Sequence, residues 1–155
     1  FGWTGTSDPT ACLSVPVVID WMEQQMPGGW ESIMKRNNHL AILAQSYLNK
    51  QLAWKPVAPS TMIGSMAALE MPDSTEVTRP TSPLYSDPFQ DRLWERYQVE
   101  VPIVPWPAPP KRLIRISAQL YNQPEDYVQL LHAIKASKSE WGESQKILSL
   151  SSQKD

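Results

Sequence analysis

The sequence predicts an α+β protein in which helices cover one face of a small antiparallel sheet. Segments with apolar residues at helical spacing alternate with short segments of period two, in the order helix, helix, strand, helix, strand, strand, helix. The last two strands, 99–106 and 111–118, are joined by a short connection, so they should be antiparallel neighbours. The 155 residues suffice for one domain with its own core and are too few for two.

Two helices are predicted ahead of the sheet. Asp8 and Pro9 are a typical helix start, because aspartate caps free amide groups and proline fits the first helical position. This helix should run toward Met26 and end at Pro27-Gly28-Gly29. A second helix is predicted from about Trp30 to Leu52. Its expected buried positions are Ile33, Leu40, Ala44, Tyr47 and Leu48, and its expected exposed positions are Lys35, Arg36, Gln45 and Lys50.

The middle of the chain is predicted to be cut into short elements by its prolines. Residues 62–71 are apolar on both faces and bounded by prolines, which favours a strand. Residues 72–84 have the composition of an irregular surface loop. Asp87 repeats the cap-and-proline signal and should begin a short helix that reaches Tyr97. Prolines within 99–106 confine that segment to an edge or irregular strand.

The strand 111–118 is the central predicted element. Ile114 and Ile116 point to one face, and Arg115 points to the other. Asn122 and Glu125 have the spacing of a capping box, so a helix should run from Asn122 to about Ala136 and cover the isoleucine face. Residues 137–155 are expected to be a polar tail.

Composition and charge exclude several classes of partner. The formal net charge is -2 and no basic run follows a predicted helix, so we expect no nucleic-acid partner. No apolar run approaches the roughly 18 residues that span a bilayer, so we expect no membrane segment. A single cysteine, Cys12, excludes an internal disulfide framework, and we expect a cytoplasmic protein.

Arg115 is the first candidate functional residue. The planar guanidinium of an arginine binds a carboxylate through two parallel hydrogen bonds and stays charged in any environment. The alternative is an edge-strand salt bridge to a residue such as Glu100, and periodicity alone favours this alternative.

Gly5 and Thr6 are the second candidate. They lie just ahead of a predicted helix N-terminus, where amide groups and the helix dipole favour an anion such as phosphate. The pattern does not match a P-loop, and an ordinary loop that ends in a helix cap is the simpler interpretation.

The remaining reactive side chains do not form a catalytic set. His39 and His132 have no second ligand at metal-binding spacing, so we predict no metal site. Cys12 has no histidine nearby in sequence to act as its base, which favours a buried or half-buried structural thiol.

Several motifs in order nevertheless resemble a known family. They are Phe1-Gly2-Trp3-Thr4-Gly5-Thr6-Ser7-Asp8-Pro9-Thr10-Ala11, Ala67 to Met71 after Gly64-Ser65, Val99-Glu100-Val101-Pro102, and Arg115-Ile116-Ser117-Ala118-Gln119-Leu120-Tyr121-Asn122. From Phe1 to about Ala136 the chain resembles the C-terminal part of class V aminotransferases, nearest to the isopenicillin N epimerase-like branch.

The resemblance implies part of a pyridoxal-phosphate-dependent enzyme of fold type I. It implies a loop and interdomain helix over 1–28, a small C-terminal α+β domain over 29–136, and a polar tail over 137–155. The family forms dimers with active sites at the subunit interface. Gly5 and Thr6 match the position that reaches the cofactor phosphate, and Arg115 matches the arginine that binds the α-carboxylate of the amino-acid substrate.

The resemblance also implies that part of the site lies elsewhere. A family enzyme needs a Schiff-base lysine in a large domain upstream. Lys35, Lys50, Lys55 and Lys111 have no matching context, so the chain alone should not hold the cofactor covalently. Two alternatives stay open. One is a cysteine desulfurase or desulfhydrase of the same class, and the other is a non-catalytic fragment that dimerises or binds a partner through the uncovered sheet face.

Overall fold

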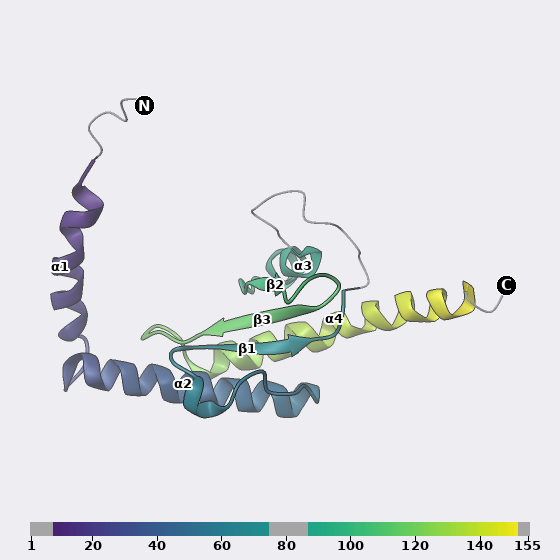
Figure 1. Cartoon of the computed structure of the whole chain (residues 1–155), viewed down its shortest axis with the longest axis horizontal. Coiled ribbons are helices and arrows are strands. Elements are labelled where there is room, and N and C mark those ends of the chain that lie inside the picture. The colour runs from purple at the N-terminus through teal and green to yellow at the C-terminus, as the bar shows by residue number, and fades with distance from the viewer. Residues whose placement is uncertain (1–7, 75–86, 152–155) are drawn as a thin grey trace. The chain divides into compact units, whose positions relative to one another are not determined.

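The chain folds as an α+β protein with an antiparallel sheet of strand order β1-β3-β2, as the sequence predicts. The computed structural model describes the backbone of residues 8–74 and 87–151, and the side chains of this part as far as Ser137 (Figure 1). The elements are α1 (Thr10–Glu23), α2 (Gly29–Leu52), the 3-10 helix η1 (Ser60–Met62), β1 (Met66–Met71), α3 (Pro88–Tyr97), β2 (Ile103–Pro105), β3 (Arg112–Ser117) and α4 (Pro124–Ser151). None of the helices described is long and apolar enough to cross a membrane.

Residues 1–36 and 37–155 form two separate units, so the boundary falls inside α2. In the first unit, α1 begins after Asp8, whose carboxylate accepts a hydrogen bond from the Thr10 amide at 2.9 Å. α1 ends at Glu23, three residues before the predicted Met26, and Gly28 and Gly29 then take positive φ angles of 86° and 59°. No side chain of α1 is buried. The predicted domain ranges stay predictions.

The register of the sheet explains why one of its faces is apolar. β1 and β3 pair with Ala67 opposite Ile116 and Leu69 opposite Ile114, and all four side chains are buried. β2 adds Ile103 opposite Ile114. Since alternate side chains point to opposite faces, Arg115 and Ser117 lie on the other, exposed face.

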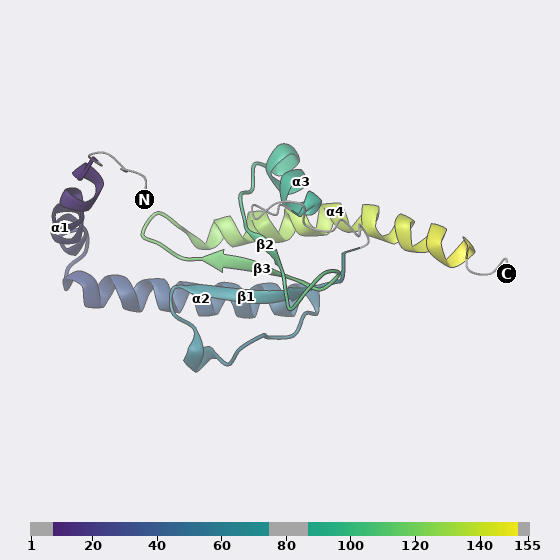
Figure 2. The ribbon, with the colours of Figure 1, turned by 45° about the horizontal axis from the view of Figure 1, so that its top comes forward.

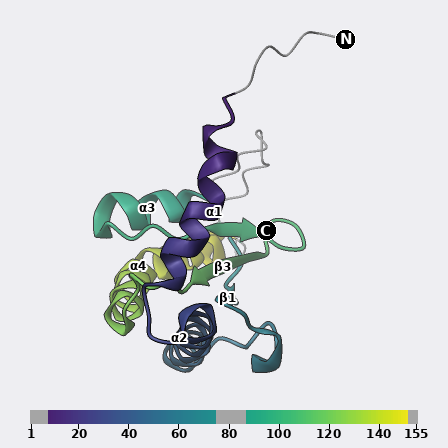
Figure 3. The same cartoon turned by 90° about the vertical axis from the view of Figure 1, so that its left-hand side faces the viewer.

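The buried face of the sheet is covered by α3, α4 and the part of α2 that follows Arg36. Figure 3 shows these helices to one side of β1 and β3, and Figure 2 shows α2 and α4 running alongside the strands. The core is a single cluster that all of these elements share, and it includes Leu48, Leu69, Phe89, Leu93, Ile103, Ile114, Leu130 and Ile134. The prediction that the helix after Asn122 covers the isoleucine face is therefore confirmed.

A buried ion pair fixes the start of α3 to the first residue of β3. Arg112 donates to both carboxylate oxygens of Asp87 at 2.8 and 2.9 Å, and its Nε donates to the Pro72 carbonyl oxygen at 3.0 Å. The same Asp87 caps α3 by accepting from the Phe89 amide at 2.8 Å. The predicted cap at Asp87 is confirmed, and its pairing with Arg112 is a contact that sequence spacing could not indicate.

Three positions of α2 differ from the prediction. Arg36, predicted to be exposed, is half-buried. Gln45 is buried and not exposed, because its amide donates to the Ala68 carbonyl oxygen of β1 at 3.2 Å. Tyr47, predicted to be buried, is exposed.

The ends of α4 also differ from the prediction. α4 begins at Pro124, two residues after the predicted Asn122, and the Asp126 carboxylate accepts from the Gln123 amide at 3.0 Å. The Asn122 side chain accepts from the Gln119 amide at 3.0 Å. At its other end the helix does not stop near Ala136 but continues to Ser151, through most of the predicted polar tail.

Candidate functional site

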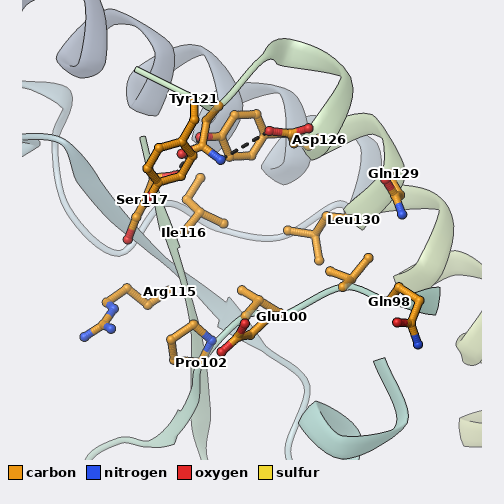
Figure 4. Close-up of a pocket in the computed structure, with 14 residues that line it drawn as sticks. Gln98, Glu100, Pro102, Arg115, Ile116, Ser117, Tyr121, Asp126, Gln129 and Leu130 are labelled. Atoms are coloured by element: carbon orange, nitrogen blue, oxygen red, sulfur yellow. Dashed lines mark hydrogen bonds between the residues drawn. The ribbon is translucent and has the colours of Figure 1, made fainter. Parts of the chain in front are cut away.

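A cavity of about 400 Å³ opens beside the second half of β3 (Figure 4). Its walls come from the segment that enters β2, from β3, and from the loop and first turns of α4. The lining residues are Gln98, Val99, Glu100, Val101, Pro102, Arg115, Ile116, Ser117, Tyr121, Asn122, Asp126, Tyr127, Gln129 and Leu130. Arg115 contributes the one cationic side chain among them.

The cavity exists because β2 covers only the first half of β3. β2 pairs with Arg112 to Ile114, and the Arg115 amide then donates to the Pro102 carbonyl oxygen at 3.0 Å. Proline has no N–H group, so Pro102 cannot return a bond and continue the ladder. The edge of β3 from Arg115 to Ser117 is therefore left facing the cavity.

The Arg115 guanidinium has no bonding partner within the described part of the chain. Its side chain is exposed, and it forms no ion pair with Glu100, although both residues line the cavity. In Figure 4 the Arg115 side chain extends away from Glu100. The salt bridge that periodicity favoured is thus not formed. An arginine that remains charged and unpaired at a cavity can accept an external carboxylate.

Hydrogen bonds fix the wall opposite Arg115. The Tyr127 hydroxyl donates to the Ser117 carbonyl oxygen at 2.7 Å, which attaches α4 to the end of β3. The Asn122 amide donates to the Asp126 carboxylate at 3.2 Å, and Figure 4 draws a dashed line that ends at Asp126. The Asp126 carboxylate therefore already accepts hydrogen bonds from the loop that precedes α4. Tyr121, by contrast, is 80% exposed at the rim.

The other predicted site residues, Gly5 and Thr6, lie outside the described residues. The structure does describe the helix start that follows them, where Asp8 accepts from both the amide and the hydroxyl of Thr10. These two hydrogen bonds, with the hydroxyl contributing more, lower the pKa of Asp8 below its usual value of 3.8. A carboxylate of the chain therefore already accepts from the first amide of α1.

None of the lysines and histidines in the described segments lines the cavity. Lys35 pairs with Glu31 at 2.7 Å on the surface of α2. Cys12 is exposed, which contradicts the prediction of a buried or half-buried structural thiol: it lies on α1, which buries no side chain. Across residues 8–74 and 87–137, no three His, Cys, Asp or Glu side chains gather as a metal site would require.

Glu100 is the cavity residue that sequence reasoning undervalued. From the sequence it is a possible salt-bridge partner for Arg115 and part of a family-like motif, without a role of its own. Extending the β2–β3 register by alternation places Glu100 on the same face as Arg115 and Ser117, because Val101 and Ile103 point into the core. The alternation along 100–103, with apolar Val101 and Ile103, predicts that Glu100 points away from the core. Pro102 favoured an irregular segment instead, so this alternation was not extended to Glu100.

Comparison with known proteins supports a relation to two named enzymes. The chain is 32% identical over 138 residues to "Probable L-cysteine desulfhydrase, chloroplastic" of Arabidopsis thaliana, and the match covers 85% of this chain and 28% of that protein. It is 27% identical over 134 residues to isopenicillin N epimerase of Streptomyces clavuligerus, with 85% of this chain and 30% of that protein covered. No family model matches the chain. The chain thus spans less than a third of the length of the relatives it matches.

Proposed function

We propose that this chain is the C-terminal portion of a pyridoxal-phosphate-dependent enzyme that acts on an amino acid, related to cysteine desulfhydrases and isopenicillin N epimerase. The unpaired Arg115 guanidinium at the cavity carries the proposal. The similarity over 85% of the chain supports it, and so does the partial coverage of both relatives.

In this proposal Arg115 binds the α-carboxylate of the substrate. Arg115 lies opposite Ala68 in the register of β1 and β3, and its amide donates to the Pro102 carbonyl oxygen, so the guanidinium projects from a strand with neighbours on both sides. A rigid strand positions a side chain more accurately than a loop does. Holding the carboxylate in one orientation fixes which bond at the α-carbon is presented for reaction.

The described residues fit the substrate end of such a site. When bound, pyridoxal phosphate acts as an electron sink for the α-carbon of an amino acid. Within this chain, Gly5 and Thr6 are the residues that we propose contact its phosphate group. The lysine that binds the cofactor and the large domain that carries it belong to the remainder of the enzyme. We also propose that the enzyme works as a cytoplasmic homodimer.

The test uses the polypeptide that includes whatever coding sequence precedes Phe1. Arg115→Gln should lower kcat/KM for the amino-acid substrate by about 10- to 100-fold, because a hydrogen bond to a charged group contributes about 1.5–3 kcal/mol. Lys111→Gln is the matched control, since it removes one positive charge just before β3 and lies outside the lining of this cavity. Equal activity of the Arg115 variant and the control would overturn the role of Arg115.

The desulfhydrase and epimerase reactions can be distinguished by measuring their products. Sulfide released from L-cysteine would identify a desulfhydrase, the reaction named for the Arabidopsis relative. Exchange of the α-hydrogen with deuterated solvent, accompanied by inversion and without sulfide release, would identify an epimerase, as named for the Streptomyces relative. A polypeptide with no lysine-bearing large domain and neither activity would indicate a non-catalytic binding fragment.

A further inference from the structure

We infer that Glu100 selects the substrate of this site, and that the substrate is an amino acid whose side chain ends in an ammonium or similar cation. The inference rests on the proposed function, because it requires Arg115 to hold the α-carboxylate. Arg115 and Glu100 line the same cavity and are not paired with each other. A ligand that carries both charges can satisfy both groups at once.

Glu100 is the carboxylate left available in this cavity. Two carboxylates line it, and Asp126 already accepts hydrogen bonds from Gln123 and Asn122. Within the described residues, no donor bonds the Glu100 side chain. Figure 4 shows its carboxylate near Pro102, between Arg115 and Leu130.

The surface between the two charged groups suits an aliphatic chain. Carbon surface is supplied chiefly by the half-buried Pro102, since Ile116 and Leu130 also line the cavity but are each only 3% exposed. A volume of about 400 Å³ falls within the usual range of about 300–1,000 Å³ for small-molecule pockets. An apolar wall with a cation-binding group at one end and an anion-binding group at the other is complementary to an α-amino acid with a methylene chain and a terminal ammonium.

The surroundings of Glu100 on its other side also favour a cation. Glu100 is shared with a second cavity of about 250 Å³, which Gln90, Asp91 and Trp94 also line. Trp94 is 51% exposed, and the face of an indole ring attracts a cation. The side-chain oxygen of Gln90 already accepts a hydrogen bond from the Ile103 amide at 2.7 Å. Only a ligand long enough to pass Glu100 into the second cavity would also meet the Asp91 carboxylate and the Trp94 ring.

The test measures binding to the 155-residue chain by ¹H–¹⁵N NMR titration with L-lysine and with L-norleucine. The two ligands share the α-carboxylate, the α-ammonium and the four-carbon side chain, and they differ in the terminal ammonium. L-lysine should bind about two- to fivefold more tightly, the range typical of one exposed ion pair, and should shift the amide signals of Glu100 and Ser117. L-ornithine and 2,3-diaminopropionate then report which chain length fits the separation of the two charges.

Glu100→Gln should remove the preference for L-lysine and leave the affinity for L-norleucine unchanged. Glu95→Gln on α3 is the matched control, because Glu95 is exposed and lies outside both cavities. A lysine preference that survives in Glu100→Gln overturns the inference alone. If Arg115→Gln leaves the binding of both ligands unchanged, or if neither ligand shifts signals near Arg115, the proposed function fails as well.

Discussion

The two arginines of β3, three positions apart, differ in burial and in bonding partners. Arg112 is 6% exposed and is satisfied by Asp87, the Pro72 carbonyl oxygen and the ring of Phe89, whose centroid is 5.7 Å from its guanidinium carbon. Arg115 is exposed and has no side-chain partner within the described residues. An odd spacing on a strand places the two side chains on opposite faces. Arg112 therefore belongs to the structure of the core, and Arg115 is available to a ligand.

The first prediction at the residue scale concerns the buried pair of Arg112 and Asp87. Asp87→Ala should destabilise the chain by about 3–5 kcal/mol, because it leaves a buried guanidinium without its counter-charge. Asp87→Asn keeps a side-chain oxygen that can cap α3 and so separates the loss of the cap from the loss of the charge. The measurement is urea unfolding followed by circular dichroism.

A double variant provides the control for this pair. Asp87→Ala combined with Arg112→Met removes both charges, so it should be more stable than Asp87→Ala alone by about 1 kcal/mol or more. A double variant that is less stable than the single one would show that the uncompensated charge is not the main cost.

The second prediction at the residue scale concerns Asp8. The Thr10 hydroxyl and amide favour the charged form and lower the pKa of Asp8 below 3.8. Since the pKa is lower in the folded state, the charged Asp8 carboxylate contributes stability above about pH 3.8, and that contribution is lost as the pH falls through the lowered pKa. Thr10→Val should raise the pKa of Asp8 toward 3.8, as followed by NMR titration of its carboxyl carbon. An unchanged pKa would contradict the assigned cause.

At the scale of elements, the sequence predicted what depends on local pattern. The alternation in β3, the cap at Asp87 and the apolar stripe of α4 each depend on residues a few positions apart, and each is observed. The burial of Gln45 could not be predicted, because it depends on a carbonyl group of β1, 23 positions away along the chain. The cavity likewise depends on where β2 stops pairing with β3, which requires the register of two strands.

The element-scale prediction concerns the attachment of α4 to β3. The Tyr127 hydroxyl donates to the Ser117 carbonyl oxygen at 2.7 Å, at the end of the strand that carries Arg115. Tyr127→Phe should cost about 0.5–1.5 kcal/mol of unfolding free energy, the net contribution of one hydrogen bond. Tyr121→Phe is the matched control, because Tyr121 is 80% exposed and should change stability by less than about 0.5 kcal/mol. Equal effects of both variants would mean that the Tyr127 hydroxyl contributes nothing to the attachment.

At the scale of the whole molecule, the two units differ in what they bury. The unit of residues 37–155 contains the core cluster, with side chains from the sheet and from three helices. In the unit of residues 1–36, α1 is rich in large apolar residues and buries none of them. Leu13, Val17, Val18, Ile19 and Trp21 are between 48% and 70% exposed. A helix with this composition is typically covered by other protein surface.

The last prediction is that the isolated chain self-associates through α1. Val18 is 53% exposed, so covering the rest of its side chain stabilises an interface by about 0.8–1.5 kcal/mol in each chain, and Val18→Glu should raise the dissociation constant of the self-associated form by about tenfold or more. Ser14→Glu adds the same charge to the same helix without removing an apolar side chain, and it should leave the constant within a factor of about three. Sedimentation velocity over a range of concentrations measures both variants. A chain that stays monomeric at every concentration would contradict the prediction, and equal effects of both variants would assign the association to charge and not to the apolar surface of α1.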